Sequence, residues 1–487
     1  MEVTRKRAYR GSGSGLIWAL PVAAAVVLAV GIGHSEPIGW TVLALVIVGA
    51  LALTLPAIGD AAILTWVVLE VVAYPFVRAP QTQTILTFDR VWIMGLVGVL
   101  FVVPRRFPAS RATRFVWVSF AVFVAAFGVR AFLTRTPDLS PQVTWFDAIL
   151  LPFILFLVGR RLLGTVESRV RLAGAFAISG TVLGAVGIWE RISGSELASL
   201  SGGLPRVDFQ LGVIRISGTY NVPEVFALNL LICLGMTCYW LQVRGRNARL
   251  LGSVAVAVQA AAIGLSLFRA AWVGVLVIVI ASFGFRPKRG MRALVTVGLV
   301  GLAGLFVIVP LEHTQAGATR LNDTANVDTR FATYLVGYHL FRQAPLFGVG
   351  VDQFPSFAPT AGQERFHGIA NQIYPHSSYV AVLAEDGLLG FIPFLLLNVA
   401  IVRLIRTTRR SARSHEEDVF GATLLGISVA FFLMSIGLTM LPYEPSNAFF
   451  AVVLGAAASL VDGRHVTPRR SGEPGVERVP VAPQPVR

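Results

Sequence analysis

Long apolar stretches alternate with short polar segments along almost the whole chain. A helix needs about 20 apolar residues to cross a bilayer, and about fourteen stretches approach that length. They lie near residues 14–33, 38–58, 61–77, 90–104, 115–133, 144–159, 170–190, 222–242, 250–267, 270–285, 293–311, 377–402, 420–440 and 447–462. The third, fourth and tenth are short enough to be tilted or re-entrant segments. The pattern predicts an all-α fold, a polytopic transmembrane helix bundle of about 12–14 spans.

The composition excludes a soluble protein of this length. Hydrophobic residues make up 55% of the 487 positions and charged residues only 14%, too apolar for a single aqueous domain. The formal net charge of +15 would suggest nucleic acid if the charges formed a patch on a soluble domain. The basic residues fall instead in short segments between apolar stretches, so membrane lipid is an expected partner and nucleic acid is not.

These basic segments also predict the topology. Cytoplasmic loops carry an excess of Lys and Arg. With the N-terminus placed inside, every strongly basic turn falls on the same side of the membrane; these turns are at 105–114, 160–171, 244–249, 286–292 and 403–413. We therefore expect a multi-pass protein of the cell inner (plasma) membrane, with both termini cytoplasmic. Residues 1–13 form a basic N-terminus, 14–462 the transmembrane domain and 463–487 a disordered tail rich in Pro and Arg.

Two of the connections that fall on the outer side are long, near residues 191–221 and 312–376. Long connections usually carry function rather than mere linkage. The second contains an amphipathic stretch, Asp328 to Leu340, that predicts a helix on the membrane surface, followed by a tight turn at Gly348 to Gly350.

Three residues on the predicted outer side could carry chemistry: Arg215, Arg269 and His376. An arginine at the membrane boundary is costly unless it pairs with an anion. The guanidinium group matches phosphate oxygens bidentately, so two such arginines could hold a diphosphate. A nearby histidine is the natural proton acceptor at neutral pH.

Each residue alone also has a structural interpretation. Arg269 could cap a helical hairpin or pair with Glu70 or Glu190. Arg215 could be a solvated loop charge, and His376, which follows a proline, could cap the next helix. The three residues therefore gain weight only from their surroundings.

Those surroundings resemble the O-antigen ligase and polysaccharide polymerase superfamily. Residues 344–354 contain Pro-Leu-Phe-Gly-x-Gly, and residues 375–390 carry the histidine followed by Tyr and a Glu-x-Gly, as in the family's C-terminal signature. Residues 266–272 look like its Ser-Arg-Gly-Ala-Trp hairpin, and residues 215–227 look like its Arg-x-x-Gly-Thr-Phe-x-Asn-Pro-Asn segment. The resemblance covers about residues 205–400.

The chain departs from the family pattern at three places. Ser377 stands where the family usually has Asn, Leu267 and Phe268 separate the Ser and Arg of the hairpin, and Glu224 replaces an Asn after Pro223. The departures leave both arginines and the histidine in place. They leave the identity of the substrate open.

The resemblance implies an inverting glycosyltransferase that needs neither nucleotide nor metal and acts in cell-surface polysaccharide assembly. It would transfer a glycan from a polyprenyl-diphosphate carrier, such as undecaprenyl diphosphate, to a hydroxyl group of a glycan or lipid acceptor. On this hypothesis Arg215 and Arg269 hold the diphosphate and His376 is the general base. Residues assigned to substrate binding are Arg330, Tyr334, Tyr379 and Glu385.

Other functions stay open. A polymerase that joins lipid-linked repeat units would use the same chemistry. A transporter or flippase of lipid-linked sugars would line a central cavity with arginines, and here only Arg130 is expected deep in a span, near Glu70. A structural membrane subunit is a further alternative. The outer acids Asp323, Asp328, Asp352 and Glu364 form no dense cluster, which argues weakly against a metal site. Asn322 and Asp323 together with Asp328 could still hold an ion.

Overall fold

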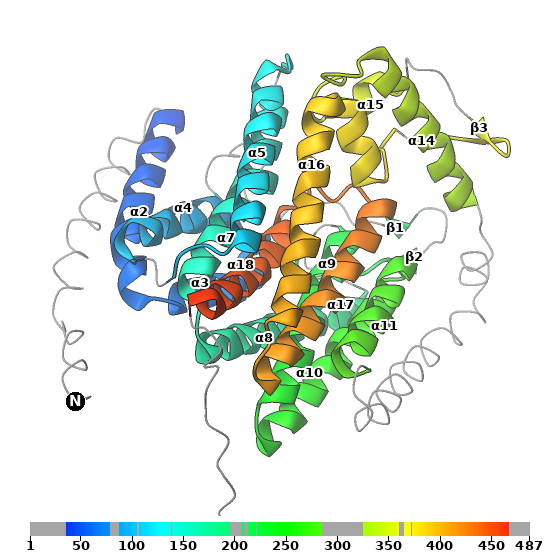
Figure 1. Cartoon of the computed structure of the whole chain (residues 1–487). Coiled ribbons are helices and arrows are strands. Elements are labelled where there is room, and N and C mark those ends of the chain that lie inside the picture. The colour runs from blue at the N-terminus through cyan, green and yellow to red at the C-terminus, as the bar shows by residue number, and fades with distance from the viewer. Residues whose placement is uncertain are drawn as a thin grey trace, which may run out of the picture.

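The computed structural model describes residues 36–77, 87–104, 107–137, 139–194, 207–208, 213–220, 222–284, 325–359, 365–371 and 373–466. These residues form a bundle of long helices with α14 beside one end (Figure 1). The predicted spans at 14–33 and 293–311 lie outside the described residues, as do the basic N-terminus and all of the predicted tail beyond Val466.

Every predicted span that falls on described residues contains a helix. The helices are α2 (Glu36–Ile58), α3 (Ala61–Val77), α4 (Phe88–Val102), α5 (Arg111–Leu133), α6 (Ser140–Trp145), the π-helix η1 (Phe146–Leu150), α7 (Leu151–Leu162), α8 (Val166–Ser193), α9 (Pro223–Val243), α10 (Arg246–Leu265), α11 (Arg269–Phe283), α14 (Ala325–Gln343), α15 (Phe354–Phe357), α16 (Ser378–Arg410), α17 (His415–Gly437) and α18 (Glu444–Val466). Two short antiparallel hairpins, β1 (Val207–Asp208) with β2 (Val213–Ile214) and β3 (Arg365–Phe366) with β4 (Ile369–Ala370), are the described strands.

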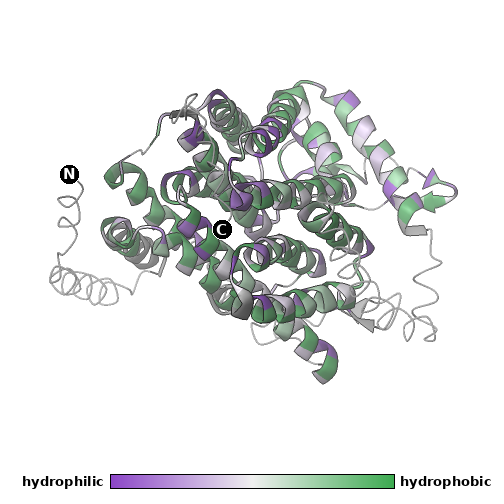
Figure 2. Cartoon of the chain, turned by 60° about the horizontal axis from the view of Figure 1, so that its bottom comes forward, coloured by the Kyte–Doolittle hydropathy of each residue, from purple (hydrophilic) through white to green (hydrophobic). Residues whose placement is uncertain are grey.

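The predicted all-α transmembrane bundle is confirmed. Within the described residues, eight helical segments are long and apolar enough to cross a membrane, one of them formed by α6, η1 and α7 end to end. Shorter apolar helices lie in α2, α3 and α11. Figure 2 shows the bundle helices mostly green, with hydrophilic residues gathered toward helix ends and connections. Close packing joins α7 to α18, α8 to α9, α11 to α17 and α5 to α16.

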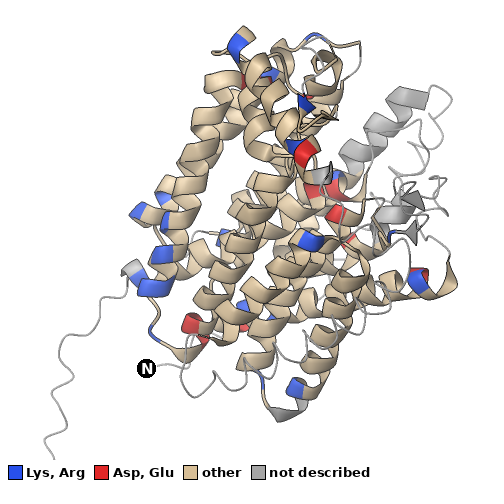
Figure 3. Cartoon of the chain, turned by 90° about the vertical axis from the view of Figure 1, so that its right-hand side faces the viewer, with Lys and Arg blue, Asp and Glu red and all other residues tan. Residues whose placement is uncertain are grey.

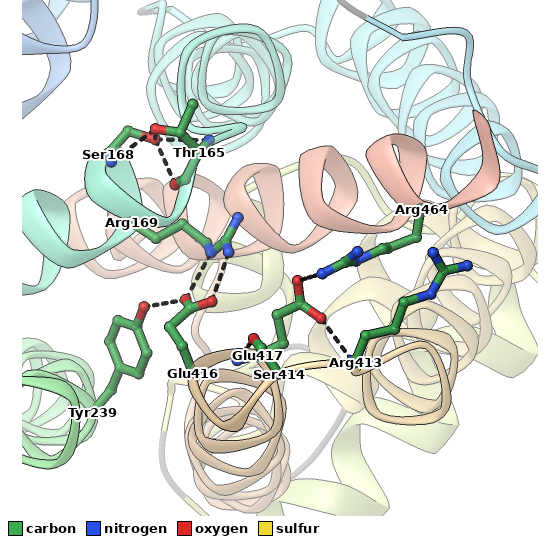
Figure 4. A network of polar contacts seen from close by, with 9 residues as sticks. All are labelled: Thr165, Ser168, Arg169, Tyr239, Arg413, Ser414, Glu416, Glu417 and Arg464. Atoms are coloured by element: carbon green, nitrogen blue, oxygen red, sulfur yellow. Dashed lines mark hydrogen bonds and ion pairs between the residues drawn. The ribbon is translucent and has the colours of Figure 1, made fainter. Parts of the chain in front are cut away.

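A buried polar network ties four helices together (Figure 4). Arg169 of α8 is 1% exposed and donates from Nε and Nη2 to the two carboxylate oxygens of Glu416 at 3.0 and 2.8 Å. The hydroxyl of Tyr239, on α9, also donates to Glu416. Next to it, Glu417 of α17 forms an ion pair with Arg464 of α18. Buried charges need such complete pairing, so the network fixes how these helix ends meet.

The helix α16 reverses direction at Gly387, whose φ of 60° and ψ of −157° are not helical. The rings of Tyr379 and Phe394 lie 5.3 Å apart, although a straight helix would separate these positions by about 22 Å. The segment 378–386 therefore folds back along the rest of α16. The sequence predicted one span at 377–402, but only the part after Gly387 is a continuous helix. Glycine permits the break because it has no Cβ at this positive φ.

The loop 345–350 fills this break. Its backbone exchanges hydrogen bonds with residues 384–389 on both sides of Gly387, which satisfies groups that the interrupted helix leaves unpaired. The bonds are Leu388 N to Pro345 O at 2.9 Å, Leu389 N to Leu346 O at 3.1 Å, Val349 N to Ala384 O at 2.9 Å and Gly350 N to Glu385 O at 2.9 Å. A Cβ on Gly348 would lie 2.3 Å from the backbone of Glu385, so this close approach requires glycine.

The predicted helix within 328–340 is confirmed as α14. It packs against α16 and against the β3–β4 hairpin. In this hairpin, Nδ1 of His367 lies 3.1 Å from Oδ1 of Asp328 on α14.

We name the two ends of the bundle by residues. The His376 end holds the N-termini of α9 and α11 and the C-terminus of α17, and the Arg410 end holds the C-terminus of α16 and the N-termini of α5 and α17.

Candidate active site at the His376 end

The backbone around His376 is held in an unusual conformation. His376 has a φ of 47°, in the left-handed region that costs a non-glycine residue of order 1–3 kcal/mol. Ser378, two residues on, anchors the segment: its amide donates to Leu438 O at 2.9 Å, and its hydroxyl accepts from Met440 N at 2.8 Å. The chain that follows α17 therefore fixes the entry to α16 and, with it, the position of the histidine.

The His376 imidazole is partly buried between charges of opposite sign. Burial lowers the pKa of His376 below its usual value of 6.5, and the positive charge of Arg330 lowers it further. The carboxylate of Glu224 acts in the opposite direction. The ring is therefore neutral at pH 7, which is the state that a general base requires.

Arg215 lies in the loop before α9 and pairs with Glu224 in the first turn of that helix. The distance from Arg215 Nη2 to Glu224 Oε1 is 2.9 Å, and the two side chains are 15% and 19% exposed. The loop is fixed by Glu190 at the end of α8, because its Oε2 accepts from the amides of Ser217 at 3.1 Å and Gly218 at 2.8 Å. Nε of Arg215 is buried without a hydrogen bond in the described structure, so the guanidinium retains donor capacity.

The helix α14 contributes Arg330 and Tyr334. The Tyr334 hydroxyl donates to Ile436 O at 3.0 Å and lies 3.4 Å from His376 O. Burial raises the pKa of Tyr334, against the opposing effect of the Arg330 charge. A Cβ placed on Gly437 would lie 3.3 Å from Arg330 Nη1. The two α14 side chains therefore sit over the end of α17, next to the histidine.

Arg269 begins α11 at the same end of the bundle. The predicted hairpin is present: α10 and α11 are joined by a tight turn in which Leu267 has a φ of 56°. Further along α11, a Cβ on Gly274 would lie 3.4 Å from the side chain of Met434, so Arg269, more than one turn earlier, is level with the end of α17. It is exposed and has no ion pair within the described residues, so neither Glu70 nor Glu190 neutralises it.

Tyr379 and Glu385 have structural contacts on α16. The Tyr379 ring packs edge-on against Phe394. Glu385 is 9% exposed, and its Oε1 accepts from the amide of Phe354 at 2.9 Å. This bond ties the start of α15 to the helix break. A role of either residue in substrate binding stays a prediction.

Arg130 contacts the loop that fills the helix break and has no ion pair with Glu70 among the described residues. It stands in the last turn of α5, with its guanidinium 5.8 Å from the centre of the Phe347 ring and Nη2 3.5 Å from Gly348 O. Its charge also acts on Asp386. These contacts hold the loop 345–350, so Arg130 has a structural explanation.

The arrangement defines a polytopic helical membrane protein that gathers cationic side chains and a histidine at one end of its bundle. Residues 253–395 match the family described as O-antigen ligase. The match confirms the predicted resemblance over a region that contains Arg269, Arg330 and His376, whereas Arg215 and Glu224 precede it. A comparison of the chain with curated proteins finds no match. In the described part of the chain no group of three or more His, Cys, Asp or Glu residues could hold a metal ion.

Sequence reasoning missed the partners that position the site. Glu224 stood out only as a departure from the family pattern, and nothing indicated that it pairs with Arg215. The turn at Gly218 and the proline that begins α9 are the signals that could have brought these residues together, since they fold the intervening chain back. The anchoring contacts of Glu190 and Ser378 are long-range and leave no local pattern.

Proposed function

We propose that the protein transfers a glycan from a polyprenyl-diphosphate carrier to an acceptor hydroxyl at the His376 end of the bundle, on the outer face of the membrane. The observation that carries the proposal is that Arg330, and Glu224 with its ion-pair partner Arg215, lie near His376 although they come from segments far apart in the chain. Arg269 begins a helix at the same end. The match to the O-antigen ligase family supports this class of reaction.

The proposed reaction is a single displacement at the anomeric carbon. The neutral imidazole of His376 takes the proton of the acceptor hydroxyl while the new C–O bond forms. The bond between the anomeric carbon and the diphosphate oxygen breaks, and its electron pair leaves with the diphosphate. Arg215 and Arg269 neutralise the charge that develops there, with Arg330 as a further cation. An in-line attack inverts the configuration at the anomeric carbon.

Transfer in proteoliposomes with a lipid-linked glycan donor tests the proposal. We expect His376→Ala or Arg269→Ala to reduce the rate by about 100-fold or more, since a general base or an oxyanion partner contributes that much. His367→Ala and Arg342→Ala are matched controls, because both residues are exposed and lie on the β3–β4 hairpin and α14. Near-normal transfer by either site variant would remove the assignment.

The same assay separates a ligase from a polymerase. Attachment of a single preformed glycan to a different acceptor supports the ligase, and a ladder of chain lengths grown on the carrier supports the polymerase. The face is tested separately with His367→Cys and a membrane-impermeant thiol reagent on intact cells. Labelling only after the membrane is opened would place the site in the cytoplasm and contradict the proposal.

A further inference from the structure

A cavity of about 1010 Å³ opens at the Arg410 end, between α5, α16 and α18. Five arginines line it, and no acidic residue does. They come from the first residue of α5, the last turns of α16, the following turn and the end of α18: Arg111, Arg403, Arg410, Arg413 and Arg464. None of the residues proposed for glycan transfer lines this cavity.

Acidic residues in the described part of the chain neutralise only part of this positive charge. Glu417 forms an ion pair with Arg464 and accepts from the backbone amide of Arg413 at 2.7 Å. In the described part of the chain Arg111, Arg403 and Arg410 have no ion pair. The guanidinium of Arg403 lies 5.8 Å from the centre of the Phe115 ring, which fixes its position without reducing its charge. Positive charges that line one cavity repel one another, and an anion bound among them offsets that repulsion.

An apolar groove of about 760 Å³ continues from the cavity along α16. The two share Arg403, Thr407 and Arg410, and the groove extends past Val399 to Phe432 of α17 and Tyr379 at the start of α16. The stretch of α16 that lines it is about 18 Å long, close to the roughly 15 Å of hydrocarbon in one leaflet. The polar cavity suits a charged headgroup, and the apolar groove, as long as one leaflet is deep, suits an acyl chain. A soluble anion would need only the cavity.

The positive-inside rule alone does not explain this arrangement. It requires arginines on the cytoplasmic side, but not several of them around one hollow that leads into a groove. Figure 3 shows basic residues gathered along one flank of the lower half of the bundle. Basic pockets between helices on the cytoplasmic side are the recognised setting for anionic lipid headgroups.

We propose that the cavity and groove form a binding site for an anionic phospholipid of the cytoplasmic leaflet. Its phosphate lies among Arg111, Arg403 and Arg410, and one acyl chain lies along α16. Because residues of α5, α16 and α18 line the site, an occupied site braces these three helices against one another. The proposal does not depend on the transfer reaction.

Lipid retention by the purified full-length protein tests the proposal. The protein is equilibrated with mixed micelles containing phosphatidylglycerol or phosphatidylcholine, and bound lipid is counted by native mass spectrometry. The variant is Arg403→Gln with Arg410→Gln. The control is Arg244→Gln with Arg249→Gln, which removes the same charge from exposed residues at the α9–α10 turn. Each arginine near an anionic headgroup contributes about a factor of five, so we expect about 25-fold weaker phosphatidylglycerol retention by the cavity variant.

Equal loss in both double variants, or equal retention of the two lipids by the unchanged protein, would overturn the proposal. Displacement of phosphatidylglycerol by millimolar inorganic phosphate would show a site for free phosphate and would also overturn it. If the cavity variant does not fold, a photoactivatable phosphatidylglycerol on the unchanged protein gives the answer. Labelling within residues 399–410, or at the residues of α5, α17 and α18 that line the cavity and groove, supports the site. Labelling elsewhere contradicts it.

Discussion

Glu224 is the residue of the candidate site whose change gives the sharpest prediction. It pairs with Arg215 at 2.9 Å, and its carboxylate raises the pKa of His376. In the proposed reaction a diphosphate must compete with this carboxylate for the guanidinium of Arg215. Glu224→Gln keeps the size of the side chain and removes its charge, so it separates the two effects from simple packing.

The expected gain in donor binding follows from the exposure of the pair. Both side chains retain 15–19% exposure, and solvent screening limits such a pair to about 0.2–1 kcal/mol. Release of Arg215 therefore lowers the donor KM by a factor of about five at most. A larger gain would mean that the pair is far better shielded from water than the structure shows.

The pH dependence gives an independent readout with a defined sign. His376 acts as a base only when it is neutral, so its pKa sets the acid limb of the profile of kcat/KM against pH. The Glu224 carboxylate raises that pKa, and its removal lowers it. The acid limb of Glu224→Gln therefore moves to lower pH.

The assay is donor-dependent transfer in proteoliposomes across a pH series, with Glu167→Gln as the control. Glu167 is an exposed acid in the first turn of α8 and lies 4.0 Å from Arg171, so its change tests a lost charge outside the site. A higher donor KM, or an acid limb that moves to higher pH, would refute the role of Glu224 as a resting counter-ion of Arg215. Glu224 would then be a residue that binds substrate directly.

Three further predictions concern stability. Gly387→Ala lowers the free energy of unfolding by more than about 2 kcal/mol, because a Cβ there would lie 2.6 Å from the facing loop. The control Gly368→Ala has open space around it and costs about 1 kcal/mol of backbone strain. Equal losses of stability in denaturant titrations of the two variants would contradict this prediction. Arg169→Ala costs about 3–5 kcal/mol since it leaves Glu416 buried without its bidentate partner, and a change below 1 kcal/mol by the same titration would refute the pairing. The folded protein becomes less stable as pH falls below 6.5, because the unfolded chain binds a proton at His376 more readily; a melting temperature whose dependence on pH is unchanged in His376→Gln would exclude this contribution.

The contacts of Arg130 bear on the transporter alternative. A transporter of lipid-linked sugars needs cationic side chains along a central path. Arg130 instead braces the loop 345–350 at the helix break, through Phe347 and the carbonyl oxygen of Gly348. The one deep arginine that the sequence offered for transport thus has a structural role.

The sequence by itself determined the helices and the resemblance to the O-antigen ligase family. Apolar stretches of spanning length leave the chain few choices, because a backbone in lipid must satisfy its hydrogen bonds within the segment. The sequence also located the helix α14 within the long connection, and the hairpin that carries Arg269 between two apolar stretches. The motif residues around Gly348 and His376 indicated where function would lie.

Only the tertiary structure decided how these parts meet. The reversal of α16 at Gly387 depends on a loop forty residues earlier that supplies the missing hydrogen bonds, and no local pattern encodes such a partner. The same holds for Glu224, which turns Arg215 from a free charge into half of an ion pair. Charges and backbone groups act through whatever lies within a few ångströms, and in a folded chain that distance bears no relation to separation in sequence.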